Sequence, residues 1–176
     1  MSTYNQIMLG RNLNYKNLTE LINSDIQILI FLRHLGCNLS LSLIADFAKI
    51  EQRHNVKLPV TYFSQGSKNY NDHFWTSKYP DTAVVYDTDL KFSKMFGLKE
   101  GTVTEVLNPQ AAMCSLKAMA NGHFPTGSKG NVFMLPGAFI YQDGQRVFSH
   151  IANSASDMPD FEDLIKNVVL KALKTG

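Results

Sequence analysis

The chain has 176 residues, of which 44% are hydrophobic and 18% charged, a balance typical of one soluble globular domain. Its formal net charge of +2 and scattered basic residues argue against nucleic acid or an anionic membrane as a partner. The two cysteines, Cys37 and Cys114, are too few for a disulfide scaffold or a thiolate-rich metal site. We therefore expect no metal and no cofactor.

The first 24 residues are polar and rich in asparagine, with no basic region followed by an apolar stretch, so no signal peptide is readable. The longest apolar run, residues 26–32, is far shorter than the roughly 20 residues of a membrane span. These features predict a cytoplasmic protein. We expect one domain over residues 1–176, with an N-terminal extension at 1–24 and an insertion of undefined structure at 101–130.

Strand and helix patterns alternate along the rest of the chain. The run at 26–32 is apolar except for Gln27 and is rich in β-branched and aromatic residues, which is typical of a strand buried on both faces. We expect the other strands at 59–63 and 82–86, a hairpin at 138–149, and helices at 39–54, 67–78, 88–96, 111–120 and 159–173. Strands alternating with helices imply parallel pairing, and the hairpin adds antiparallel strands. The expected fold is α/β, a central mixed β-sheet with helices on both faces.

Individual helix ends carry their own signals. Ser67 is a candidate N-cap for the second helix, and Asp87 or Thr88 can cap the third. The last helix should carry Pro159 in its first turn and an apolar stripe that continues to Ala172 and Leu173.

The most informative segment is residues 31–40, where the buried strand ends, Gly36 permits a tight turn, and Cys37 falls at the start of a helix. Unpaired backbone N–H groups and the positive end of the helix dipole favour a thiolate there. Arg33 or His34 would add positive charge if either side chain turned toward the sulfur. The alternative is a buried structural cysteine.

Residues 31–37 resemble the strand–turn–cysteine motif of the peroxiredoxin-like branch of the AhpC/TSA superfamily, which has the thioredoxin fold. The resemblance extends from about Asn17 to Lys171 and includes the segments 87–98 and 135–144. It implies a thioredoxin-like fold with one active-site cysteine. It also implies that His34, Leu135 and Pro136 contact the substrate. Pro136 resembles the proline that such folds place in cis opposite the cysteine, and both its cis and trans forms are open.

Two positions differ from that family. Redox-active members usually open the helix with Cys-x-x-Cys, whereas Ser40 stands here in place of the second thiol. Ser40 can donate a hydrogen bond to a Cys37 thiolate but cannot attack a mixed disulfide. His34 stands where typical peroxiredoxins have threonine.

The sequence thus predicts a thiol-dependent redox protein with Cys37 as nucleophile, Ser40 as hydrogen-bond partner and Arg33 as electrostatic activator. Its partner would be glutathione or a protein thiol, and a homodimer is left open. Cys114 is either a buried helix-packing cysteine or one that resolves Cys37. The alternative function is that of a redox-inactive binding or scaffold protein with the same fold.

Overall fold

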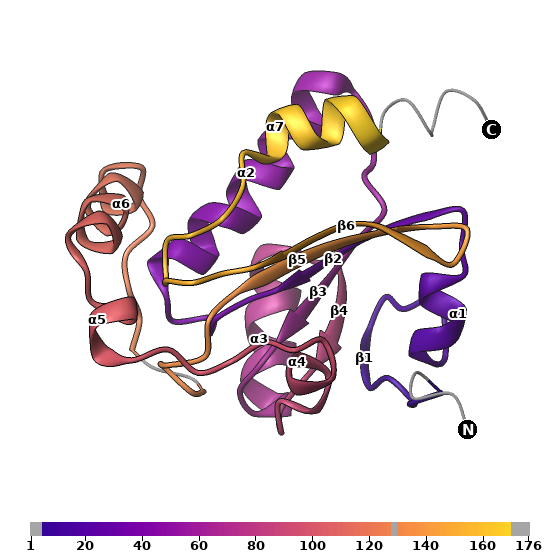
Figure 1. Cartoon of the computed structure of the whole chain (residues 1–176), viewed down its shortest axis with the longest axis horizontal. Coiled ribbons are helices and arrows are strands. Elements are labelled where there is room, and N and C mark those ends of the chain that lie inside the picture. Colours follow the sequence, from indigo (N-terminus) through magenta and orange to yellow (C-terminus); the bar gives the residue numbers. More distant parts are fainter. Residues whose placement is uncertain (1–4, 128–129, 170–176) are drawn as a thin grey trace.

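Six strands form one mixed sheet in the computed structural model, which describes residues 5–127 and 130–169 (Figure 1). The strand order across the sheet is β1-β4-β3-β2-β5-β6. The strands are β1 (Gly10–Arg11), β2 (Ile26–Phe31), β3 (Val60–Ser64), β4 (Ala83–Tyr86), β5 (Gly137–Gln142) and β6 (Gln145–Ile151). The helices are α1 (Leu18–Ile22), α2 (Asn38–His54), α3 (Lys68–Lys78), α4 (Lys91–Met95), α5 (Val103–Val106), α6 (Pro109–Ala120) and α7 (Phe161–Leu164), which continues as the π-helix η1 (Ile165–Val169).

Strand β2 lies inside the sheet, parallel to β3 and antiparallel to β5. Successive side chains of a strand point to opposite faces, so a strand with helices above and below must be apolar throughout. Ile28 and Ile30 belong to one core cluster, whereas Leu29 and Phe31 belong to the other. The prediction of a strand buried on both faces is confirmed.

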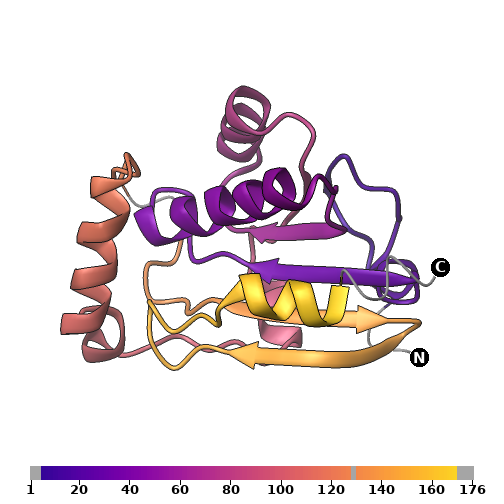
Figure 2. The same ribbon diagram turned by 90° about the horizontal axis from the view of Figure 1, so that it is seen from above.

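Helices cover both faces of the sheet, as predicted. On one face, α2, α3 and α7 contribute Phe47, Trp75 and Phe161 to the same cluster. On the other face, α1 and α4 contribute Leu18 and Phe92, among others, around the stacked rings of Phe31 and Phe63. Figure 2 shows α2 and α7 side by side over the sheet.

The N-terminal residues contribute to this core. Strand β1, which the sequence pattern did not indicate, pairs antiparallel with β4, and Leu18 and Leu21 of α1 are buried in the second cluster. The described residues of the expected extension therefore pack as part of the same layers.

Two helix starts differ from the prediction. Helix α4 begins only at Lys91, after Leu90 in the left-handed region, although Asp87 does accept hydrogen bonds from the backbone N–H groups of Phe92 and Ser93. The last helix begins after Asp160, so the placement of Pro159 in its first turn is wrong. The Asp160 carboxylate caps the helix by accepting a hydrogen bond from the Glu162 N–H, and this fixes where the helix starts. Ala172 and Leu173 lie outside the described residues.

Within the insertion, α5 and α6 are well-formed helices that stand beyond the end of the sheet, next to the N-terminal part of α2 (Figures 1 and 2). Helix α6 buries only Ala111 and Ala118, and it exposes Met113 and Leu116. No helix in the described part of the chain is long and apolar enough to cross a membrane.

The difference in burial between β2 and α6 predicts a difference in stability. Leu29→Ala, at a fully buried position, should lower the free energy of unfolding by about 2–5 kcal/mol, because the cavity stays unfilled. The same change at Leu116, whose side chain is 63% exposed, should alter it by less than about 0.5 kcal/mol. Urea unfolding followed by circular dichroism measures both, and equal losses would contradict the described packing.

Candidate functional site

Cys37 is the N-cap residue of α2, at the carboxyl end of the central strand. Its backbone is extended, with φ −83° and ψ 122°, and its N–H donates to the His34 carbonyl at 3.0 Å, closing the turn that leaves β2. The residue is only 7% exposed. The prediction that Cys37 lies at the start of the helix is confirmed, and its largely buried side chain makes no capping hydrogen bond to the helix backbone.

The Arg33 side chain turns toward this sulfur. Its Nη1 donates to Cys37 Sγ at 3.2 Å and its Nη2 donates to the Val132 carbonyl at 2.6 Å, while its Nε has no partner among the described residues. Arg33 is 7% exposed and permanently charged, and a buried cation is stabilised by an adjacent anion. Among the described residues, the side chain that is hydrogen-bonded to this guanidinium and can become an anion is that of Cys37.

Ser40 does not make the expected contact. Its side chain is almost fully buried on the first turn of α2, yet among the described residues no hydrogen bond joins it to Cys37. The donor to the sulfur is Arg33, whose longer side chain reaches back from the end of β2.

His34 is buried as well and lies in the turn itself. Burial, followed by repulsion from the Arg33 guanidinium, lowers the pKa of His34 to about 4. The ring is therefore neutral at pH 7, and only one of the two candidate cations, Arg33, brings positive charge to the sulfur.

A loop from the insertion lies against this turn. The Thr126 N–H donates to the Gly36 carbonyl at 3.2 Å, and a Cβ on Gly36 would lie 1.5 Å from the Gly127 carbonyl oxygen. Only glycine fits so close an approach. Further along the chain, paired hydrogen bonds join Asn131 to Gln65. The sequence indicates a loop after the helix at 111–120, but it gave no indication that the loop packs against this turn, and Gly36 was expected only to permit a tight turn.

Leu135 and Pro136 separate in the structure. Leu135 is 1% exposed and packs with Val106 and Ala152, so it offers no surface to a substrate. Pro136 lines a cleft, and the peptide bond that precedes it is trans.

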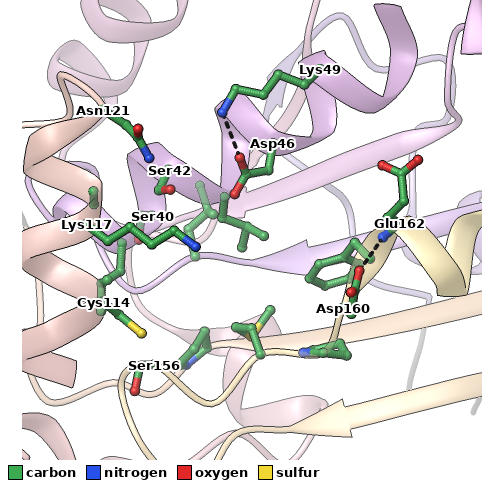
Figure 3. Close-up of a pocket in the computed structure, with 18 of the residues that line it drawn as sticks. Ser40, Ser42, Asp46, Lys49, Cys114, Lys117, Asn121, Ser156, Asp160 and Glu162 are labelled. Carbon is green, nitrogen blue, oxygen red and sulfur yellow. Dashed lines mark hydrogen bonds and ion pairs between the residues drawn. The ribbon is translucent and has the colours of Figure 1, made fainter. Parts of the chain in front are cut away.

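That cleft has a volume of about 720 Å³ and lies between α2, α6 and the segment that leads into α7 (Figure 3). It brings together Arg33, Ser40 and Pro136, but Cys37 is not among its lining residues.

Cys114 does line the cleft, and its sulfur points into it in Figure 3. Cys114 is half-buried, so the expectation of a buried helix-packing cysteine is wrong, because α6 turns this face to the cleft rather than to the core. Both thiols are free.

Among the described residues, no three histidine, cysteine, aspartate or glutamate side chains come close enough together to hold a metal ion.

Comparison with known proteins identifies the fold. No protein-family model matches the sequence, and no curated protein matches it significantly. Among solved structures, the chain is similar to an exposed lipoprotein thioredoxin of Streptococcus pneumoniae, at 13% identity and a TM-score of 0.53, covering 96% of this chain and 97% of that one. It is also similar to PrxQ of Xylella fastidiosa, at 16% identity and a TM-score of 0.53, covering 99% and 98%.

A third similar structure is the thiol peroxidase of Chromobacterium violaceum, at 10% identity and a TM-score of 0.51, covering all of this chain and 90% of that one. At these identities the likeness is one of fold. Together with the mixed six-stranded sheet, it defines a thioredoxin-like α/β fold.

The buried His34 predicts a pH dependence of stability. The unfolded chain takes up this proton near pH 6.5 but the folded chain only near pH 4, so the unfolded state binds more protons between these values. The free energy of unfolding should therefore fall as the pH falls through this window, with a contribution of at most about 1.4 kcal/mol per pH unit.

His34→Gln should remove that contribution, so its unfolding free energy should decline less steeply than that of the wild type below pH 6.5. Chemical denaturation across the pH range measures the two curves. They should run parallel above about pH 7.5, where both states carry neutral imidazole. Parallel curves at every pH would show that His34 is accessible to protons in the folded protein.

Proposed function

We propose that this protein is a thiol-dependent redox protein in which Cys37 reduces a small oxidant of the hydroperoxide class. The observation that carries the proposal is the hydrogen bond from Arg33 Nη1 to Cys37 Sγ, at the N-terminus of α2. A buried, fixed positive charge bonded to the sulfur and the positive end of the α2 dipole both stabilise negative charge on the sulfur as it attacks. The thiolate is the nucleophilic form of cysteine.

The chemistry balances without a cofactor. The Cys37 thiolate attacks the hydroxyl oxygen of the hydroperoxide, so that an S–O bond forms and the O–O bond breaks. Cys37 becomes a sulfenic acid, and the alkoxide leaves and takes up a proton. An external thiol then condenses with the sulfenic acid and releases water. A second thiol cleaves the mixed disulfide and restores Cys37. Glutathione or a protein thiol would supply both.

Burial and sequence limit which partners fit each step. With Cys37 only 7% exposed, Thr126 bonded to Gly36 and Val132 bonded to Arg33, the first step favours an oxidant of few atoms. Ser40 occupies the position of a second helix thiol, and its hydroxyl cannot attack a disulfide, so the reducing thiols come from outside this turn.

Removing the Arg33 charge tests the proposal. Arg33→Gln should slow the oxidation of Cys37 by hydrogen peroxide by roughly 10- to 100-fold, because a hydrogen bond to a charged group contributes about 1.5–3 kcal/mol. The rate is measured as sulfenic acid trapped on the Cys37 peptide by mass spectrometry. Arg53→Gln, an identical change at an exposed arginine, should leave it unchanged.

Arg33→Lys separates charge from folding. This variant keeps the positive charge, so its Cys37 should be oxidised faster than the Cys37 of Arg33→Gln. Circular dichroism verifies that each variant is folded. A folded Arg33→Gln variant that oxidises at the wild-type rate would contradict the proposed role.

The second candidate function is a redox-inactive binding or scaffold protein. The burial of Cys37 favours it, since the Arg33 bridge from Cys37 to Val132 would then serve to hold the loop in place. Failure of Cys37 in the folded wild-type protein to react with hydrogen peroxide, with reaction only after unfolding, would favour this function over the redox one.

A further inference from the structure

The cleft beside α6 contains a second thiol with its own polar surroundings. Cys114 and Lys117 lie one turn apart on α6, a spacing that places them on the same helix face. Figure 3 shows the sulfur and the amino group of these two residues both directed into the cleft. Lys117 is exposed, so its ammonium can reach a ligand.

Lys117 differs from the other surface cations of this cleft. Lys49 pairs with Asp46 at 3.1 Å, and Arg53 pairs with Glu162 at 2.7 Å. Within the described residues, no acidic side chain forms an ion pair with Lys117. Lys117 is therefore an exposed cation of the cleft without an acidic partner, next to a free thiol on the same helix face.

A buried hydroxyl provides an independent indication of a ligand. Ser40 lines the cleft from α2, opposite α6, and its side chain is only 3% exposed. In the described part of the chain no hydrogen bond of its hydroxyl is found, and the Oγ of Ser156, which also lines the cleft, is buried without a partner, whereas buried polar groups are nearly always paired. Ligand sites combine a concave surface with a few convergent polar groups of this kind.

We propose that the cleft binds a small anionic disulfide of the glutathione class and that Cys114 forms a mixed disulfide with it. Lys117 attracts a carboxylate of the ligand, and Ser40 donates a hydrogen bond to it from the opposite wall. This proposal does not depend on the reactivity of Cys37, which does not line the cleft.

The exchange step balances in atoms and electrons. The Cys114 thiolate attacks one sulfur of the disulfide, an S–S bond to Cys114 forms, and the original S–S bond breaks. The departing sulfur leaves as a thiolate and takes up the proton that Cys114 lost. The Cys114 sulfur is oxidised and the departing sulfur is reduced, so no further oxidant is needed.

The test uses two disulfides of opposite charge on the folded full chain, in a Cys37→Ser background. Oxidised glutathione is negatively charged and cystamine positively charged, and the adduct on the Cys114 peptide is followed over time by mass spectrometry. Lys117→Gln should slow the reaction with oxidised glutathione by about two- to fivefold, the usual effect of one exposed ion pair, and should not slow cystamine.

Lys94→Gln is the matched control, because it removes the same charge from α4, a helix that does not line the cleft. It should leave both rates unchanged. The proposal is overturned if Cys114 reacts only after unfolding, or if Lys117→Gln slows both disulfides equally or neither. Because Cys37 is absent from this background, failure of the peroxide reaction at Cys37 would be a separate result.

Discussion

A guanidinium buried at the end of the central strand is the constraint around which the site is arranged. Arg33 cannot lose its charge, and an unpaired buried ion costs several kcal/mol. The guanidinium therefore needs hydrogen-bond acceptors. Nη1 donates to the Cys37 sulfur and Nη2 donates to the Val132 carbonyl. One side chain thus connects the start of α2 to Val132, in the segment that leads to β5.

The sheet determines where that side chain lies. Because β2 is apolar on both faces, it has to run through the middle of the sheet, and its carboxyl end opens between β3 and β5. At Gly36 the turn that follows packs against Gly127 of the insertion, and Cys37 becomes the N-cap of α2. The position of the thiol follows from the burial of the strand before it.

Local patterns in the sequence were sufficient to predict most of the fold. The apolar run of β2, the helical period of α2 and the Ser67 cap of α3 are signals contained within a few residues. Strand β1 was missed because two residues carry no alternation, and only its pairing with β4 makes it a strand. The late start of α4 was missed because it depends on a left-handed Leu90.

The candidate site was predictable only in part. The residue types and the turn are readable, but which donor reaches the sulfur depends on side-chain directions, and Arg33 rather than Ser40 makes that contact. The Val132 contact joins residues 99 positions apart, a separation that no local pattern reveals. The exposure of Cys114 likewise depends on where α6 stands relative to α2, which its own composition does not indicate.

Under the two proposals, the two thiols, which lie in different surroundings, would carry out two separable reactions. Cys37 is buried against a fixed cation and is suited to a small oxidant, whereas Cys114 lines an open cleft and is suited to a larger anionic disulfide. Neither role requires the other thiol. Oxidants of different size should therefore modify different cysteines of the same folded chain.

The most direct measurement of the central claim is a crystal structure of the protein after brief treatment with dilute hydrogen peroxide. The account predicts one additional oxygen on the sulfur of Cys37, within hydrogen-bond distance of Arg33 Nη1, and an unmodified Cys114. An oxygen on Cys114 with Cys37 unmodified would contradict it.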